Sequence, residues 1–452
     1  MKKSVEAYTL EDRKKHIVVK EKNKEQGIKC DQHSISGAVS QRACVYCGAR
    51  VVLNPITDAV HIIHGPIGCS SYTWDIRGSL SSDSEMYRNS FSTDLQERDI
   101  IFGGEKKLAG AIDEIVESMS PQTIFVYSTC VVGVIGDDLD AVCKQAEKKY
   151  NIRVIPVKSS GFAGSKKDGY QAACNAIISL MDDKEYKIDI KDHRTLNYLG
   201  DFNLAGEVWI LNNYFKEIGV NMITGVTGDS TIEKLKKAQN ASFNIVQCAG
   251  SSIYLAKMME ERFKIPYEQV SFFGIQDTAN SLLNVARLTG DKKIIRDTEV
   301  FIKQKKADIA SILQKYKEKC AGKKVAIYVG GGFKAISLIK QFNELGMTTV
   351  MVGTQTGRQE EYDTIKELAE EGTVILDDTN PTELQKFIKE KGADLLVGGV
   401  KERPLAYKLG IAFIDHNHER KLPLLGFEGA VNFAKEVDLT VNSPVWNLVR
   451  EG

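Results

Sequence analysis

The 452-residue sequence has no long apolar run and no excess of charge of either sign. A membrane span needs roughly 20 apolar residues, and the stretch MKKSVEAYTLEDRKKH lacks the apolar centre of a signal peptide. We therefore expect a cytoplasmic protein with no membrane partner. Lys and Arg, 60 together, equal Asp and Glu, also 60, so the charge balance gives no support to nucleic-acid binding.

What the sequence does contain is nine cysteines. In a reducing cytosol they do not form a disulfide framework, so each is a buried small hydrophobe, a reactive thiol or a metal ligand. The first of these is the expectation for Cys143, Cys174 and Cys320, which lie in helix-like contexts, and no role is assigned to Cys30 in the polar leader.

After this leader, β-branched runs such as TIFVYST, FNIVQC and KKVAIYVGG alternate with amphipathic helical patterns. Such alternation predicts parallel sheets with helices on both faces. We predict an α/β protein of three Rossmann-like, doubly wound domains at residues 40–190, 191–320 and 321–452, following a polar leader at residues 1–39. The charged helical stretch from Arg287 to Lys319 is expected to connect two domains.

Ligands of doubly wound folds bind at the carboxyl ends of the strands. Cys130 follows the run IFVYST, Cys248 ends FNIVQC, and the glycine-rich GGGFK at residues 330–334 follows VAIYV. These positions are the first indication of function. GGGFK matches neither GxxxxGK[ST] nor GxGxxG, so a nucleotide site is not expected, and close approach of the backbone to a bulky anion is the remaining functional interpretation.

The segment HIIHGPIGC raises the question of a zinc site or an activated nucleophile. His61 and His64 lack the Glu of an HExxH helix and have no third ligand at zinc-like spacing, so structural histidines are favoured. A nucleophilic pair of Cys69 with His64 has no obvious feature to lower the pKa of the thiol. The pair CVYC at residues 44–47 has no second CxxC to complete a zinc ribbon.

Cys44, Cys69 and Cys130 share a different pattern, because each lies in or beside a turn of the first predicted domain. A cubane iron–sulfur cluster requires four thiolates. The spacing is compatible with a partner chain that supplies the fourth thiolate. It is also compatible with Cys47 or Cys30 as an internal fourth ligand.

Long ordered blocks of the sequence resemble the nitrogenase α-subunit superfamily, which has the nitrogenase component 1 fold. The blocks include CVYCGARVVLNPITDAVHIIHGPIGCSSYTWDIRG, STDLQERDIIFGGEKKL, VYSTCVVGVIGDDLDAVC and GFEGAVNFAKEVDLTVNSPVW. Within the superfamily, the likeness is greatest to the scaffold subunits on which the iron–molybdenum cofactor is assembled. The resemblance implies three Rossmann-like domains and an α2β2 heterotetramer with a homologous N-type subunit.

The resemblance also implies site residues. Cys44, Cys69 and Cys130 match the family's ligands to a [4Fe–4S] cluster that is completed by a partner cysteine. Cys248 matches the cysteine that holds one end of the large iron–sulfur cofactor or its precursor. At the other end, counting forward from GGVKER places Asn417, which we favour, whereas counting back from GFEG places His416. The family's basic positions around the cofactor and its organic acid correspond to Lys334 and Lys401.

Departures from the family pattern favour a scaffold over a reductase. The segment SSGFAGSKKDGYQAA has Lys166, Lys167 and Gln171 but no histidine where the reductase has one. The resemblance thus implies an assembly scaffold rather than a turnover enzyme, with no catalytic residue. Such a scaffold receives an iron–sulfur precursor from a donor protein, supports its maturation with molybdenum and homocitrate, and transfers it to cofactor-free nitrogenase. The nitrogenase iron protein acts as the reductant and delivers the metal. A catalytic nitrogenase α subunit, a vanadium-type scaffold counterpart and a metal-free α/β binding protein are the alternatives.

Overall fold

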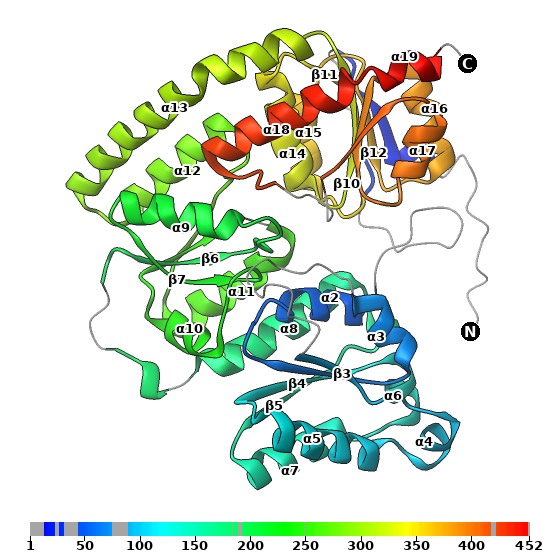
Figure 1. Ribbon diagram of the computed structural model, residues 1–452, viewed down its shortest axis with the longest axis vertical. Coiled ribbons are helices and arrows are strands. Elements are labelled where there is room, and N and C mark those ends of the chain that lie inside the picture. Colours follow the sequence, from blue (N-terminus) through cyan, green and yellow to red (C-terminus); the bar gives the residue numbers. More distant parts are fainter. Residues whose placement is uncertain are drawn as a thin grey trace. The chain divides into compact units, whose positions relative to one another are not determined.

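The computed structural model describes residues 13–22, 27–30, 44–74, 89–182, 184–188, 192–247, 249–416 and 422–450. The chain divides into two compact units. The first, here called the cysteine unit, consists of Ala43–Val270 and Leu283–Thr298. The second, called the C-terminal unit, consists of Met1–Arg42, Ser271–Leu282 and Glu299–Gly452. Three sheets of mainly parallel strands run through the chain (Figure 1), which confirms the predicted α/β class.

The first sheet belongs to the cysteine unit and has the strand order β3-β2-β4-β5. All its strand pairs are parallel. Its strands are β2 (Val60–His64), β3 (Ser90–Ser92), β4 (Thr123–Ser128) and β5 (Arg153–Val157). The chain leaves β2 toward one edge and β4 toward the other, so the carboxyl ends of these two strands form a topological switch point.

The second sheet, also in the cysteine unit, repeats this order as β7-β6-β8-β9. Its strands are β6 (Thr195–Leu199), β7 (Asn221–Val226), β8 (Phe243–Val246) and β9 (Tyr267–Gln269). One hydrophobic core joins both sheets, since buried residues of β4 and β8 belong to the same cluster as those of α2 (Val45–Leu53), α8 (Lys166–Met181), α10 (Ile232–Lys237) and α11 (Ala249–Phe263). This shared core explains why two sheets form one compact unit.

Further helices of this unit complete its layers. They are α3 (Ile67–Trp74), α4 (Glu97–Phe102), α5 (Glu105–Met119), α6 (Cys130–Ile135), α7 (Leu139–Tyr150) and α9 (Glu207–Glu217). Helices α5 and α7 lie against the face of the first sheet opposite α2 and α8 (Figure 1). The Asp138 side chain accepts a hydrogen bond from the Ala141 N–H and so caps the start of α7.

The third sheet belongs to the C-terminal unit and has the order β1-β12-β11-β10-β13-β14. Its parallel strands are β10 (Lys324–Val329), β11 (Thr348–Thr354), β12 (Val374–Asp377), β13 (Leu395–Gly398) and β14 (Ala412–Asp415). The helices of this part of the chain are α14 (Gly332–Glu344), α15 (Gln359–Leu368), α16 (Pro381–Lys391), α17 (Arg403–Lys408), α18 (Gly426–Val441) and α19 (Val445–Arg450). Helices α12 (Ile275–Leu288) and α13 (Lys292–Cys320) contribute residues to both units, and α13 covers most of the predicted connector, from residue 292 on.

Strand β1 (Ile17–Val19) pairs antiparallel with β12 and forms an edge of the third sheet. The predicted polar leader therefore contains a strand, which its three-residue apolar run IVV did not reveal. The limits predicted for the leader and the three domains stay predictions, because a division into two units does not test them.

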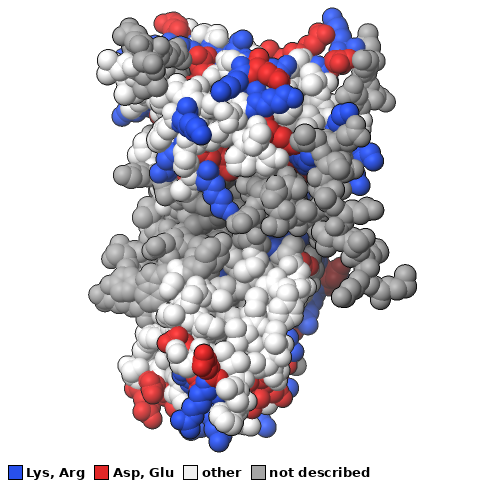
Figure 2. Space-filling view, turned by 90° about the vertical axis from the view of Figure 1, so that its right-hand side faces the viewer, with Lys and Arg blue, Asp and Glu red and all other residues white. Residues whose placement is uncertain are grey.

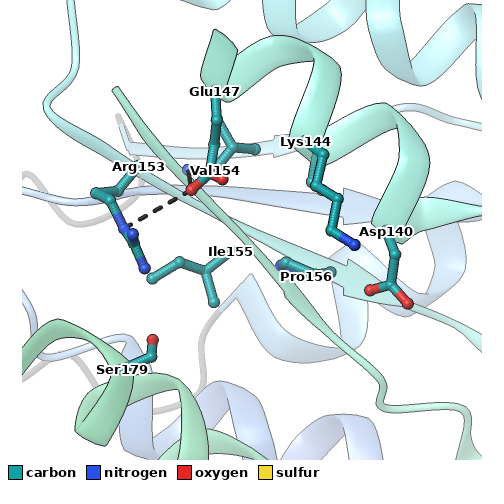
Figure 3. Close-up of a pocket in the computed structure, with 9 residues that line it drawn as sticks. Asp140, Lys144, Glu147, Arg153, Val154, Ile155, Pro156 and Ser179 are labelled. Carbon is teal, nitrogen blue, oxygen red and sulfur yellow. Dashed lines mark hydrogen bonds and ion pairs between the residues drawn. The ribbon is translucent and has the colours of Figure 1, made fainter. Parts of the chain in front are cut away.

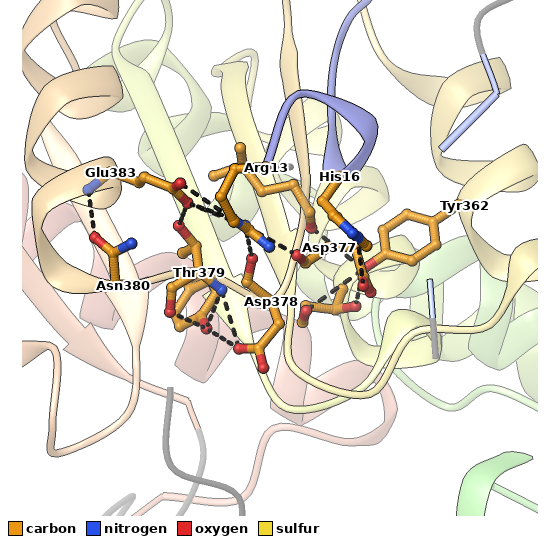
Figure 4. Close-up of polar contacts among 11 residues, drawn as sticks. Arg13, His16, Tyr362, Asp377, Asp378, Thr379, Asn380 and Glu383 are labelled. Atoms are coloured by element: carbon orange, nitrogen blue, oxygen red, sulfur yellow. Dashed lines mark hydrogen bonds and ion pairs between the residues drawn. The ribbon is translucent and has the colours of Figure 1, made fainter. Parts of the chain in front are cut away.

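A buried ion pair holds this strand in place (Figure 4). The Arg13 guanidinium donates to the Glu383 carboxylate at 3.0 Å and to the Asp377 carbonyl at 3.2 Å. His16 Nδ1 lies 3.5 Å from Asp377 Oδ2, and that carboxylate also accepts from the Tyr362 hydroxyl. Because the ion pair is almost fully buried, the edge strand is tied to the sheet by charge as well as by its ladder.

None of the described helices is both long enough and apolar enough to cross a membrane.

Candidate metal centre

The three cysteines predicted to bind a cluster lie at or near the starts of helices in the cysteine unit. Cys44 is the residue before α2, and its carbonyl accepts from the Gly48 N–H at 3.1 Å. Cys69 lies in α3, which follows β2, and Cys130 opens α6, directly after β4. Two of these positions follow the strands that flank the topological switch point, which is where doubly wound sheets bind ligands.

Two of the thiols, those of Cys44 and Cys130, lie beside Gly161, which begins the short turn Gly161–Ala163 ahead of α8. Cys69 is close enough to both to be affected by their charge. The Gly161 N–H donates to Cys130 Sγ at 3.2 Å. A Cβ at this glycine would lie 2.9 Å from Cys130 Sγ and 3.2 Å from the Cys44 Cβ. Only a residue without a side chain leaves this space free. Sequence reasoning missed Gly161, although it lies in the quoted segment SSGFAGSKK.

The thiols also affect one another electrostatically. Burial raises the pKa of Cys69, and the neighbouring Cys130 and Cys44 raise it further. A bound metal cluster would reverse this effect, because coordination to iron supplies the positive charge that stabilises thiolates. The donor set is therefore chemically suited to an iron–sulfur cluster.

The described residues do not form a site for a single metal ion. In the described part of the chain, no group of three or more His, Cys, Asp or Glu is placed to hold one ion. A cubane spreads its thiolates over four iron atoms, so its ligands need not converge on a single point.

The remaining described cysteines are less suited to metal binding. Burial raises the pKa of Cys174 and that of Cys143 to about 12 and that of Cys320 to about 11, so these thiols stay protonated. Cys47 is buried within α2. Cys30 belongs to the C-terminal unit, where its Sγ lies 3.8 Å from Gln359 Oε1. None of the eight described cysteines forms a disulfide.

Both histidines of HIIHGPIGC are buried in β2. His61 Nδ1 lies 2.8 Å from the Tyr127 hydroxyl, and its ring stacks on Phe125. Burial lowers its pKa well below the usual value, so the ring is neutral. His64 faces Asp137, with 3.1 Å between Nε2 and Oδ2. These contacts account for both histidines without a metal.

Exposed apolar side chains, here called the apolar area, lie on α6, which begins with the exposed Cys130, and on the nearby segments α3, α4 and residues 161–163. Its members are the exposed side chains of Ile67, Ile101, Phe102, Val134 and Phe162. Phe102 at 81% exposure and Val134 at 75% are among the most exposed large apolar side chains of the described residues. Figure 2 views the side of the molecule that carries α3, α4 and α6, and its lower half is a broad area with few charged side chains above its lower end. Exposed apolar side chains that form a contiguous surface mark protein interaction sites.

The predicted residues of the second site are only partly described. Cys248 and Asn417 lie outside the described residues. His416 is buried, and its ring packs against Phe273 at 5.6 Å and Phe433 at 6.1 Å between centroids. Lys334, in the first turn of α14, donates from Nζ to the His416 carbonyl at 3.1 Å. Lys401 is exposed in the turn after β13. The structure thus brings Lys334, after β10, next to residue 416, after β14, although β13 lies between these two strands in the sheet.

The glycine-rich turn before α14 already faces an anion of this chain. The Glu361 carboxylate accepts from the Phe333 N–H at 3.1 Å and from the Arg358 N–H at 2.9 Å. A Cβ at Gly332 would lie 2.6 Å from the Glu361 Cβ. Glycine at this position allows α14 and α15 to pack closely. The Glu361 carboxylate also partly compensates the positive end of the α14 dipole.

A cavity of about 190 Å³ lies elsewhere in the cysteine unit, between α7, β5 and α8 (Figure 3). It is lined by Asp140, Cys143, Lys144, Glu147, Arg153, Val154, Ile155, Pro156 and Ser179. None of the three predicted cluster cysteines lines it, and the Cys143 thiol beside it stays protonated. The cavity therefore has no part in the candidate metal centre.

Comparison with known proteins indicates the same fold, a family to which the chain is similar, and individual relatives within that family. The family described as "Nitrogenase component 1 type Oxidoreductase" matches residues 44–442. A Clostridium pasteurianum protein named "Nitrogenase iron-molybdenum cofactor biosynthesis protein NifE" is 62% identical over 446 residues, 97% of each chain. A Methanosarcina barkeri protein with the same name is 52% identical, covering 98% of each chain.

Proteins named as nitrogenase itself match at lower identity. A protein from Methanosarcina barkeri named "Nitrogenase molybdenum-iron protein alpha chain" is 32% identical, covering 97% of this chain and 93% of its own. A solved structure described as "Nitrogenase Cp1 at pH 6.5" superposes with a TM-score of 0.87 at 30% identity, covering 97% of this chain and 96% of the other. The predicted fold and resemblance are both confirmed.

Proposed function

Because the chain belongs to the nitrogenase component 1 family, we propose that it is a cytoplasmic scaffold subunit for assembly of the iron–molybdenum cofactor. The observation that carries this proposal is the 62% identity, over almost the whole chain, to a protein named for biosynthesis of that cofactor. Identity to the catalytic α chain is 32%. The chain thus holds and releases a cluster as its cargo, and its side chains serve ligation and positioning rather than turnover.

Cys44, Cys69 and Cys130 would ligate a resident [4Fe–4S] cluster. Support comes from the position of Cys44 and Cys130 beside Gly161, from the electrostatic effect of both on Cys69, and from the glycine N–H directed at Cys130 Sγ. Hydrogen bonds to cluster sulfurs and burial of the cluster set its potential. When bound, the cluster supplies one-electron redox chemistry. The protein's part is to hold three thiolates at fixed spacing and to limit access of water on the side of the half-buried Cys69.

The fourth ligand would come from a homologous N-type subunit. An exposed Cys130 within the apolar area around Phe102 supports this assignment, because a partner that covers the area would both bury the cluster and complete it. Two such pairs would form an α2β2 assembly. Ligation across two chains makes association dependent on metal, since the cluster stabilises only the assembled form.

A second site would hold the cargo, an iron–sulfur precursor received from a donor protein. Cys248 would be its strong anchor. We assign the opposite end to Asn417 rather than His416, because the His416 ring packs between Phe273 and Phe433. An amide is a weak ligand for iron or molybdenum, which suits release. Lys334 and Lys401 would attract the anionic cluster and homocitrate by charge.

The remaining partners follow from this role. The nitrogenase iron protein would deliver electrons and molybdenum, and cofactor-free nitrogenase would receive the product.

The test is anaerobic co-purification of the chain with its N-type partner, followed by iron analysis and electron paramagnetic resonance. We expect an iron–sulfur signal and, after loading with precursor, molybdenum and homocitrate, activation of cofactor-free nitrogenase. Substrate reduction by the complex itself would instead identify a catalytic α subunit, and a colourless, iron-free complex would overturn both proposals.

A further inference from the structure

A continuous chain of hydrogen bonds runs behind the candidate metal centre. The Gly65 N–H donates to Thr93 Oγ1 at 3.1 Å, and this hydroxyl lies 3.0 Å from His64 Nδ1. On the other side of the imidazole, His64 Nε2 lies 3.1 Å from Asp137 Oδ2. Both oxygens of that carboxylate accept from the Gly104 N–H at 3.1 Å.

The direction of each hydrogen bond follows from the chemistry of the groups. A carboxylate only accepts, so the His64 proton lies on Nε2 and is donated to Asp137. Nδ1 of the neutral ring then accepts from the Thr93 hydroxyl, whose oxygen in turn accepts from Gly65. Burial lowers the pKa of His64 against the opposing effect of Asp137. The ring therefore uses both nitrogens in one fixed orientation.

These hydrogen bonds join two of the segments that carry the proposed cluster ligands. Gly65 and Pro66 form the turn into α3, which holds Cys69, and Asp137 follows α6, which begins with Cys130. The Thr129 N–H also donates to the His64 carbonyl at 3.2 Å. A Cβ at Gly65 would overlap the Thr129 side chain, so the turn and the residue before Cys130 are in direct contact.

The third segment in the chain is the loop after α4. A Cβ at Gly104 would lie 2.6 Å from Asp137 Oδ2 and 3.0 Å from His64 Cε1. Gly104, which lies two residues after the exposed Phe102, therefore packs directly against His64 and Asp137.

We propose that His64 and Asp137 are positioning residues that fix the spacing between Cys69 and Cys130, an inference that rests on the proposed interface cluster. Neither side chain is a ligand. Each acts on the backbone segment that carries one, as groups outside the ligand sphere of metal sites do, where their loss typically weakens metal binding by about 10–100-fold.

The test measures how fast the anaerobically purified complex loses iron to an excess of bathophenanthroline disulfonate and dithionite. Asp137→Ala removes the acceptor, and His64→Gln gives a milder change. We expect both to lose interface iron about 10-fold faster or more, with an altered electron paramagnetic resonance line shape. The matched control is His61→Gln on the same strand, whose ring packs on Phe125 and Tyr127 instead. Unchanged iron loss and line shape in both test variants would overturn the proposal, as would an equal acceleration in His61→Gln.

A second readout does not depend on iron. In the iron-free complex, iodoacetamide should alkylate Cys69 about 10-fold faster in Asp137→Ala than in the wild type, because the released segment opens locally. If the wild-type complex binds no iron, the proposed cluster is wrong, and an unchanged rate would then show that the pair does not position Cys69 either. A faster rate in that case would retain the positioning role.

Discussion

Gly48 on α2 and Gly169 on α8 face each other so closely that a Cβ on Gly169 would lie 2.9 Å from the Gly48 Cα. Such a Cβ would also overlap the Val45 carbonyl. This contact allows the two helices to pack backbone to backbone. It brings the start of α2, and with it Cys44, next to the turn that leads from Gly161 into α8.

Gly169→Ala should therefore destabilise the protein by about 1–3 kcal/mol through overpacking and should reduce cluster iron. Gly110, a helical glycine of α5 with open space around its Cβ position, is the control. Gly110→Ala should stabilise by about 0.5–1 kcal/mol, because alanine is the better helix former. Urea unfolding of both variants measures this difference. Equal stability of the two would contradict the role of the close contact.

Replacement of Cys44, Cys69 or Cys130 by Ala should remove most of the interface cluster iron, since thiolates are the main restraint on a cubane. Cys47→Ala and Cys174→Ala should retain it, because both residues are buried. Iron is counted in each purified complex. Full iron in Cys69→Ala, or loss in Cys47→Ala, would refute the ligand assignment.

Acid should destabilise the cysteine unit partly through His61. The pKa of this buried ring is lowered well below its usual 6.5, so the unfolded chain binds the proton more readily. The stabilising contribution is present above pH 6.5 and declines as the pH falls from 6.5 toward the folded-state pKa, by at most about 1.4 kcal/mol per pH unit. The wild type should thus lose more stability than His61→Gln between pH 7.5 and 5.5 in urea titrations. Parallel losses would show that another group is responsible.

Loss of the Arg13 side chain should weaken the C-terminal unit. Arg13→Ala leaves the Glu383 carboxylate buried without its main partner, which costs about 3–5 kcal/mol for a buried pair. Adding Glu383→Gln should recover part of this loss, a non-additivity that a double-mutant cycle measures by thermal or urea unfolding. Arg194→Ala, which breaks an exposed pair with Asp192, should have little effect. Additive losses in the cycle would mean that the two side chains act independently.

The apolar area around Cys130 should be needed for assembly with the N-type partner. Phe102→Asp introduces a charge at its most exposed aromatic side chain, and we expect at least a 10-fold weaker association by sedimentation velocity. Leu448→Asp, at a comparably exposed position of α19, serves as control. If the Leu448 variant were weakened equally, the contact surface would lie elsewhere or extend much further.

Local patterns were sufficient to predict the parallel sheets and the position of Cys130 after a strand of one of them. Strand β4 is buried along its whole length, and its run of apolar and β-branched residues predicted a strand with Cys130 after its carboxyl end. The assignment of three cysteines to one cluster depended on family resemblance, since their spacing in the sequence contains no distance information.

Contacts between loops could not be predicted in the same way. Gly161 reaches Cys130 from the loop after a different strand, and Asp137 meets His64 across 73 positions. Strand β1 was missed because three apolar residues in a polar segment are too few to show a period, and its pairing with β12 is non-local. These features arise only when the strands are aligned in the sheet.

The position of β1 has a consequence for biosynthesis on the ribosome. Arg13 and Glu383 are 370 positions apart, and at about 5–20 residues per second their synthesis is separated by roughly 20–75 s. During that interval the nascent N-terminal segment has no strand to pair with, and its guanidinium has no carboxylate. The third sheet acquires its antiparallel edge late, whereas the first sheet, with all its strands between Val60 and Val157, can form while most of the chain is still untranslated.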